Sequence, residues 1–153
     1  MTTVVDLGSV FEIAQSVFAA MIDGDKGLLT SWDGEPVVFD DPLVAWVDVH
    51  GPFEGRAAVT TQTATAHALV RALMGMAADE SVGQEDLVDA FGEIANVVGG
   101  NVKALLPDQG TLGLPQVASA PPALPGPSHQ LHLVWRGEPL DITIWLTSKG
   151  EDR

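Results

Sequence analysis

Apolar residues recur along the chain with the spacing of three amphipathic helices. From residue 6 to residue 21 they return every three or four positions, and Asp6 stands where an N-cap is expected. A second stripe begins near Ala64 and ends at Gly75, a residue type common just after a helix. The third and clearest stripe begins near Gln84 and ends before Pro107, which disfavours helix at the preceding residue. We therefore predict helices over residues 6–21, 64–74 and 84–106.

Alternating apolar and polar residues predict strands in the rest of the chain. In residues 43–50 the odd positions are aliphatic, as expected for a strand with one buried face. Residues 51–55, rich in glycine and proline, suit a five-residue hairpin loop to the next strand. Further along, residues 137–139 suit the turn of a second hairpin. Strands are predicted over residues 43–50, 56–61, 111–118, 130–136 and 140–147.

Two segments have the composition of loops. Residues 23–42 are rich in glycine, aspartate and proline, with a candidate short strand at 37–39. Residues 119–128 hold four prolines, which lack the N–H that a strand ladder needs. The order of elements is one helix, two strands, two helices and three strands. It predicts an α+β fold in which helices pack on an antiparallel sheet. The chain has 153 residues, so we expect a single domain over 1–153.

The chain is strongly acidic. Seven Lys and Arg residues face 21 Asp and Glu residues, which gives a net charge of −14 at pH 7. Such a surface repels nucleic-acid phosphates and anionic lipid, so we expect no nucleic-acid partner and no membrane insertion. Cysteine is absent and the first residues do not resemble a signal peptide, which fits a cytoplasmic protein. A partner with a basic or lysine-bearing docking face would fit this charge, but composition alone favours the simpler interpretation that the charge only keeps the protein in solution.

The third predicted helix carries the clearest candidate for chemistry. At 100° per residue, its apolar side chains gather on one face, and Asp89, Glu93, Asn96 and Gly100 fall within roughly 40° of one line on the opposite face. We call these four residues the ridge. Two carboxylates and a carboxamide project together there, and on the next helical turn the ridge carries only Gly100, which has no side chain. The predicted buried stripe consists of Leu87, Phe91, Ile94, Val98, Val102 and Leu105.

The small residues of this helix are unusual because each interior glycine costs about 1 kcal/mol relative to alanine. Gly92, Ala95 and Gly99 share one flank, which predicts close packing against another helix. Gly100 lies on the polar ridge, where it leaves a flat place that a partner could approach.

The segment from Asp89 to Asn101 resembles the signature of the CheX/CheC/FliY phosphatases of bacterial chemotaxis. That pattern is an Asp or Ser, a Glu four residues later and an Asn three residues further. The resemblance extends over residues 43–147, and the single copy of the signature points to the CheX branch. A proline that the family carries 23 residues after the Asn is here Ser119, with Pro115 four residues earlier.

The resemblance implies hydrolysis of the aspartyl phosphate on a CheY-type response regulator. Asn96 matches the residue that positions the attacking water, and Glu93 matches the residue that pairs with a lysine of the receiver domain. Asp89 matches the Asp/Ser position, as a further docking contact or only as the solvated start of the ridge. No cofactor of the chain's own is implied, because the partner receiver domain supplies Mg²⁺.

Two further properties follow from the resemblance. CheX-like proteins pair through edge strands, so we expect a homodimer, and merging two sheet edges also protects them from aggregation. Trp46 and Trp145 lie opposite the aliphatic faces of their strands and are candidates for that interface. The alternative function is a non-catalytic regulator-binding or flagellar-switch adaptor on the same fold.

The four histidines do not predict a metal site. They are scattered at positions 50, 67, 129 and 132, and His129 and His132 should point to opposite faces of their strand. We expect structural or surface roles for all four.

Overall fold

The computed structural model describes residues 6–106 and 110–148, and the three predicted helices are present. Asp6 caps the first helix by accepting a hydrogen bond from the Ser9 N–H at 2.8 Å, and Gly75 ends the second in the left-handed conformation. Among residues 6–106 and 110–148, none of the helices combines the length and the apolar composition that a membrane span requires. The helices are α1 (Leu7–Phe18), α2 (Thr63–Met74) and α3 (Gln84–Lys103), with a π-helical turn η1 (Ala19–Asp23) and a 3-10 turn η2 (Lys26–Leu28).

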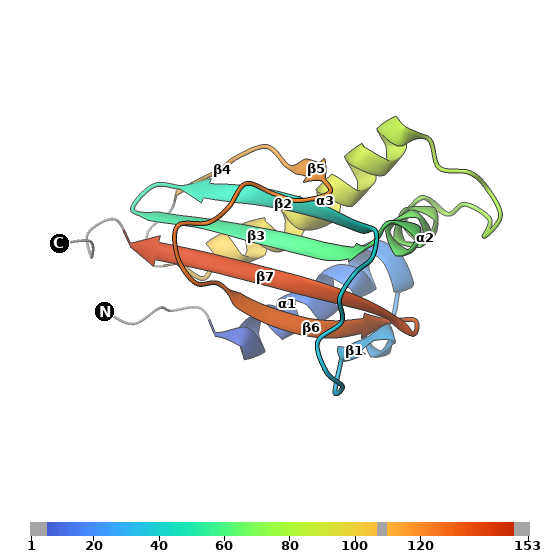
Figure 1. Ribbon diagram of the computed structural model, residues 1–153, viewed down its shortest axis with the longest axis horizontal. Coiled ribbons are helices and arrows are strands. Elements are labelled where there is room, and N and C mark those ends of the chain that lie inside the picture. The colour runs from blue at the N-terminus through green and yellow to red at the C-terminus, as the bar shows by residue number, and fades with distance from the viewer. Residues whose placement is uncertain (1–5, 107–109, 149–153) are drawn as a thin grey trace.

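The described strands form one antiparallel sheet of seven strands in the order β1-β6-β7-β3-β2-β4, with β5 also paired to β2. Helices on one face of this sheet give the predicted α+β fold (Figure 1). The strands are β1 (Leu29–Ser31), β2 (Pro42–His50), β3 (Phe53–Gln62), β4 (Thr111–Leu112), β5 (Gln116–Ala118), β6 (His129–Trp135) and β7 (Glu138–Ser148).

The main core lies between the three helices and one face of the sheet. Because side chains alternate along a strand, every second residue of the long strands enters this layer. Phe91 and Ile94 of α3 are fully buried there, against aliphatic residues of β2 and β3. The buried strand residues of the core are Leu29, Ala45, Val47, Val49, Ala57, Val59, Leu133, Trp135, Leu140, Ile142 and Ile144.

Two connections cross the opposite face of the sheet: residues 32–41 and the Pro-rich residues 119–128 (Figure 1). Under the second, Arg56 donates from Nη1 to the Pro122 carbonyl at 2.7 Å and lies over the Trp46 ring. Trp46 is consequently only 4% exposed within one chain. The prediction that Trp46 belongs to a subunit interface is therefore wrong.

The first hairpin loop has the predicted length of five residues, displaced by one position. The last pair of β2 and β3 is Val49 with Gly55, which leaves residues 50–54 between them, and His50 pairs with β4 instead. Phe53 and the two residues after it also pair with β7, which extends β3 through long-range hydrogen bonding.

Two smaller predictions need correction. Residues 37–39 form no strand, and β1 occupies residues 29–31 instead. The second hairpin turns at Arg136 and Gly137, which both have positive φ, as a type I′ turn requires. Its strands begin and end within two residues of the predicted bounds.

The predicted strand over residues 111–118 is two short strands separated by a β-bulge. Leu112 pairs with Val49 and Gln116 pairs with Trp46. Four positions on this edge are therefore opposite three positions on β2. The extra residue lies within 113–115 and shifts the alternation of side chains after it.

Candidate functional site

The four ridge residues occupy the side of α3 that faces away from the sheet. Asp89 and Glu93 are exposed, whereas Asn96 and Gly100 are half-buried. The Asn96 Nδ2 donates to Glu93 Oε1 at 3.4 Å, a long hydrogen bond that holds the amide beside the carboxylate without committing either group fully. The structure therefore brings together the carboxylate and carboxamide that the helical periodicity placed on one line.

The buried face of α3 agrees with the predicted stripe except at its end. Five of the six residues are buried, but Leu105 is 40% exposed and Leu106 is buried in its place. The helix ends at Lys103 and continues into a tighter turn, in which Leu105 N–H donates to Val102 and Leu106 N–H donates to Lys103. Regular α-helix therefore ends three residues before the predicted bound, and Leu106 takes the buried place expected for Leu105.

The ridge does not stabilise the fold electrostatically. Asp89 and Glu93 are four residues apart on one helix face, where like charges cost about 0.2–0.5 kcal/mol. Within residues 6–106 and 110–148, neither carboxylate forms a salt bridge. The arrangement suits a partner that brings the compensating positive charge.

The small flank of α3 faces the sheet and its edge, and the prediction of helix–helix packing there is wrong. A Cβ atom at Gly99 would overlap Val47 Cγ1 of β2. A Cβ atom at Gly92 would lie 3.3 Å from Pro115 Cβ, in the bulge between β4 and β5. These glycines let α3 lie close to β2 and to the bulged edge.

Gly100 is different from its neighbour Gly99. A Cβ atom there would meet only Leu112 Cδ2, at an ordinary contact distance of 3.8 Å. The fold itself therefore has room for a side chain at Gly100.

The sequence analysis did not single out Leu114, which is the most accessible large apolar side chain near the ridge. It is 86% exposed and directly precedes Pro115, the residue beside Gly92. Its exposure could not be predicted, because the alternating pattern of residues 111–118 fits an unbroken strand.

The histidines have the expected structural or surface positions. His132 Nδ1 lies 2.8 Å from Asp141 Oδ1 across the β6–β7 pair, and His50 lies 3.7 Å from Glu54. His129 is paired with Ile144, so it lies on the opposite strand face from His132. In the part of the chain that is described, no three His, Asp or Glu side chains are grouped to hold a metal ion.

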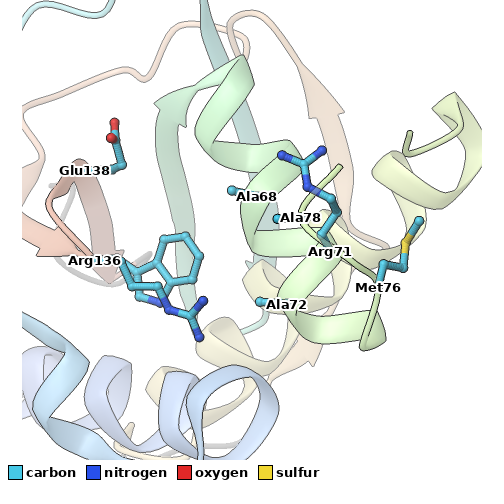
Figure 2. Close-up of a pocket in the computed structure, with 8 residues that line it drawn as sticks. Ala68, Arg71, Ala72, Met76, Ala78, Arg136 and Glu138 are labelled. Atoms are coloured by element: carbon cyan, nitrogen blue, oxygen red, sulfur yellow. The ribbon is translucent and has the colours of Figure 1, made fainter. Parts of the chain in front are cut away.

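A separate cavity of about 260 Å³ lies between α2 and the β6–β7 turn (Figure 2). None of the ridge residues lines it. Arg136, on its wall, is held by Asp23 at 2.7 Å, so that this pair is already neutral. The rest of the lining includes three alanines and the charged side chains of Arg71 and Glu138.

Comparison with protein families identifies the chain. The model described as "Chemotaxis phosphatase CheX" matches residues 43–130, more than half of the sequence. This chain belongs to the CheX family. The match includes the whole of α3 and the bulged edge beside it. A comparison with curated protein sequences found no match.

Solved CheX structures share the fold. The chemotaxis protein CheX from Vibrio vulnificus has a TM-score of 0.70 at 18% identity, covering 96% of this chain and 100% of that one. CheX from Desulfovibrio desulfuricans has a TM-score of 0.70 at 20% identity, over 94% and 100% of the two chains. A Borrelia burgdorferi complex of CheX, CheY, BeF₃ and Mg²⁺ contains a chain with a TM-score of 0.68 at 15% identity, over 95% and 100%.

Proposed function

We propose that this chain is a phosphatase that hydrolyses the aspartyl phosphate of a CheY-type response regulator. The observation that carries the proposal is the pairing of Glu93 and Asn96 on an exposed helix ridge in a CheX-family chain. A convex ridge suits a substrate that is itself a cleft in another protein. The Borrelia burgdorferi complex of CheX with CheY supports a partner of this kind.

Asn96 is the proposed catalytic residue. A carboxamide offers one acceptor oxygen and two N–H donors, so its oxygen can accept a hydrogen bond from a water molecule while an N–H contacts a phosphoryl oxygen. In the described residues the Asn96 amide makes a single hydrogen bond, the long one to Glu93, so it remains available to water and to a phosphoryl oxygen. Orienting a water for in-line attack is the main contribution that an acyl phosphate needs from a phosphatase.

Glu93 is the proposed docking residue. Its exposed carboxylate has no basic partner in the described residues, so a lysine of the receiver domain can form a charge-assisted hydrogen bond with it. Such a contact three residues before Asn96 fixes the angle at which the amide enters the receiver. Asp89, one turn earlier, and the flat surface at Gly100 extend the docking area along α3.

The proposed reaction needs no nucleophile from this chain. The oxygen of water forms a bond to phosphorus while the bond from phosphorus to the aspartyl carboxylate oxygen breaks. The water proton leaves to phosphate or solvent, and the products are the free aspartate and inorganic phosphate. The Mg²⁺ bound by the receiver balances charge on the phosphoryl oxygens.

The test is the loss of ³²P from a labelled CheY-type receiver of the same organism. We expect substoichiometric amounts of the purified chain to accelerate the loss above the receiver's own rate. A chain that binds the receiver but leaves the rate unchanged would contradict the phosphatase and support the adaptor alternative.

A further inference from the structure

The bulge beside α3 holds an apolar side chain out into solvent. Gly113 N–H still donates to the Asp48 carbonyl at 2.8 Å, so the segment remains attached to β2 on one side of Leu114. On the other side, Pro115 has no N–H to continue the ladder, and pairing resumes at Gln116. Leu114 is left between these two attachments with 86% of its surface exposed.

The extra residue of the bulge explains why Leu114 is the apolar side chain of residues 111–118 that stays exposed. Leu112 lies against Gly99 and Gly100, and Val117 lies against Gly92, although the two are five positions apart in the chain. In an unbroken strand, residues an odd number apart point to opposite faces, so both could not contact α3. The extra residue of the bulge lets Leu112 and Val117 both contact α3, and it turns Leu114 out of the layer in which they pack.

Leu114 is placed level with the ridge. The segment runs antiparallel to α3, with Leu112 beside Gly99 and Pro115 beside Gly92. Leu114 therefore lies at the height of the turn that carries Asn96. The flank it adjoins is only about 50° around the helix from Asn96.

We propose that Leu114 is a docking residue for the receiver domain: it enters an apolar patch next to the receiver's phosphorylation site when Asn96 enters the site itself. This inference rests on the proposed function and extends its docking surface from α3 to the bulged edge. Leu114 contributes to affinity and to the approach angle, and it does not touch the phosphoryl group.

A receiver is favoured over a second copy of the chain as the occupant. A homodimer through this edge would place the second copy beside the ridge that carries Asn96. Two copies meeting here would also bring their exposed carboxylates together, Asp89 and Glu93 among them. A receiver that presents a lysine beside an apolar patch would complement both the ridge carboxylates and the exposed Leu114.

The experiment compares Leu114→Ser with Val38→Ser in the full chain. Val38 is the matched control because it is 87% exposed and lies in the 32–41 connection, on the opposite face of the sheet (Figure 1). With the ³²P-labelled receiver as substrate, we expect Leu114→Ser to raise KM about tenfold and to leave kcat within about twofold. Tenfold corresponds to about 1.4 kcal/mol, near the lower limit for burial of a leucine side chain. Leu114→Met should restore most of the affinity, and Val38→Ser should match the unmodified chain.

The outcomes separate this inference from the function on which it rests. Titration with a beryllofluoride-treated receiver gives the affinity without turnover, and Asn96→Ala serves as a variant that binds without hydrolysing. If the unmodified chain is active and Leu114→Ser leaves KM unchanged, only the inference about Leu114 is overturned. A fall in kcat alone, or a change of mass in light scattering that points to a second copy, also overturns it. If the unmodified chain neither binds nor hydrolyses, both proposals fail together.

Discussion

At the scale of single residues, the ridge of α3 is organised for a partner more than for the fold. Asn is a poor residue for a helix interior, and the adjacent carboxylates of Asp89 and Glu93 repel each other. Asn96 makes one long hydrogen bond, to Glu93, in the described structure. Changes to these side chains should therefore affect recognition and hydrolysis while the fold persists.

Asn96→Ala should abolish accelerated dephosphorylation without unfolding the protein. Asn96 lies opposite the buried stripe, so the change opens no cavity, and alanine is the better helix former by about 0.5 kcal/mol. Loss of the group that orients the water should return hydrolysis to the receiver's own rate, a fall on the order of 10²-fold. Single-turnover loss of ³²P measures the rate, and urea unfolding measures the stability.

Asn101→Ala is the control for that substitution. Asn101 is an exposed asparagine on the same helix, and it donates to the Val97 carbonyl away from the ridge. It should keep full activity. A folded Asn96→Ala protein that still accelerates phosphate loss would mean that the ridge is not the active site.

Glu93→Gln should weaken binding of the receiver mainly at low salt. The substitution removes the charge of the proposed contact with lysine, and salt screens contacts between exposed charges. The affinity difference should therefore shrink as ionic strength rises toward 1 M. Glu35→Gln, at an exposed carboxylate in the 32–41 connection, is the charge-matched control. If Glu93→Gln leaves the affinity for the receiver unchanged at low salt, Glu93 is not the docking residue.

At the scale of elements, the contact between α3 and the sheet gives adjacent glycines opposite roles. Gly99 is buried against Val47, whereas Gly100 faces open space apart from Leu112. Both glycines weaken the isolated helix equally, so their different surroundings alone distinguish them.

Gly99→Ala and Gly100→Ala should change stability in opposite directions. At Gly99, overlap with Val47 should cost about 1–3 kcal/mol and outweigh the gain in helix propensity. At Gly100, the added methyl group has room, so the free energy of unfolding should rise by about 0.5–1 kcal/mol. Urea denaturation of the two variants measures both changes.

Gly100→Ala, the variant expected to be more stable, also tests docking of the receiver. If the receiver approaches the backbone at Gly100, Gly100→Ala should bind it more weakly although its fold is firmer. Equal stabilisation by both substitutions would contradict the proposed contact between Gly99 and Val47. Unchanged binding by Gly100→Ala would remove Gly100 from the docking area.

At the scale of the whole molecule, the two edges of the sheet are not equivalent. The edge formed by β4 and β5 lies beside the ridge, whereas β1 covers only residues 133–135 of β6 at the other edge. Residues 129–131 of β6 lack a β1 partner in the described structure. A dimer that leaves the ridge accessible would therefore use the β6 edge.

We predict that the purified chain is a homodimer of about 32 kDa, twice its own 16.1 kDa. The physical reason is that pairing of exposed edges satisfies their free backbone hydrogen-bonding groups. Light scattering at micromolar concentrations measures the mass. A 16 kDa particle across that range would contradict the prediction.

Much of the architecture could be predicted because it depends on local patterns. The helical periodicity of residues 84–106 placed Asp89, Glu93 and Asn96 opposite the core, and alternation in residues 43–50 identified the two faces of β2. The signature in α3 added the family, which the match over residues 43–130 confirms. Periods of 3.6 and 2 residues are properties of the chain itself, so they are visible before folding.

The remaining features depend on contacts between residues far apart in the chain, and only the tertiary structure decided them. The bulge beside Leu114 exists because β2 pairs with both β4 and β5, which no local pattern of residues 111–118 records. Trp46 is buried because the Pro-rich connection crosses its face of the sheet, with Arg56 between them. Residue types and their spacing determined the fold class and the ridge. Strand pairing and the paths of the connections determined which apolar side chains stay exposed beside it, because those depend on which distant segment fills the space.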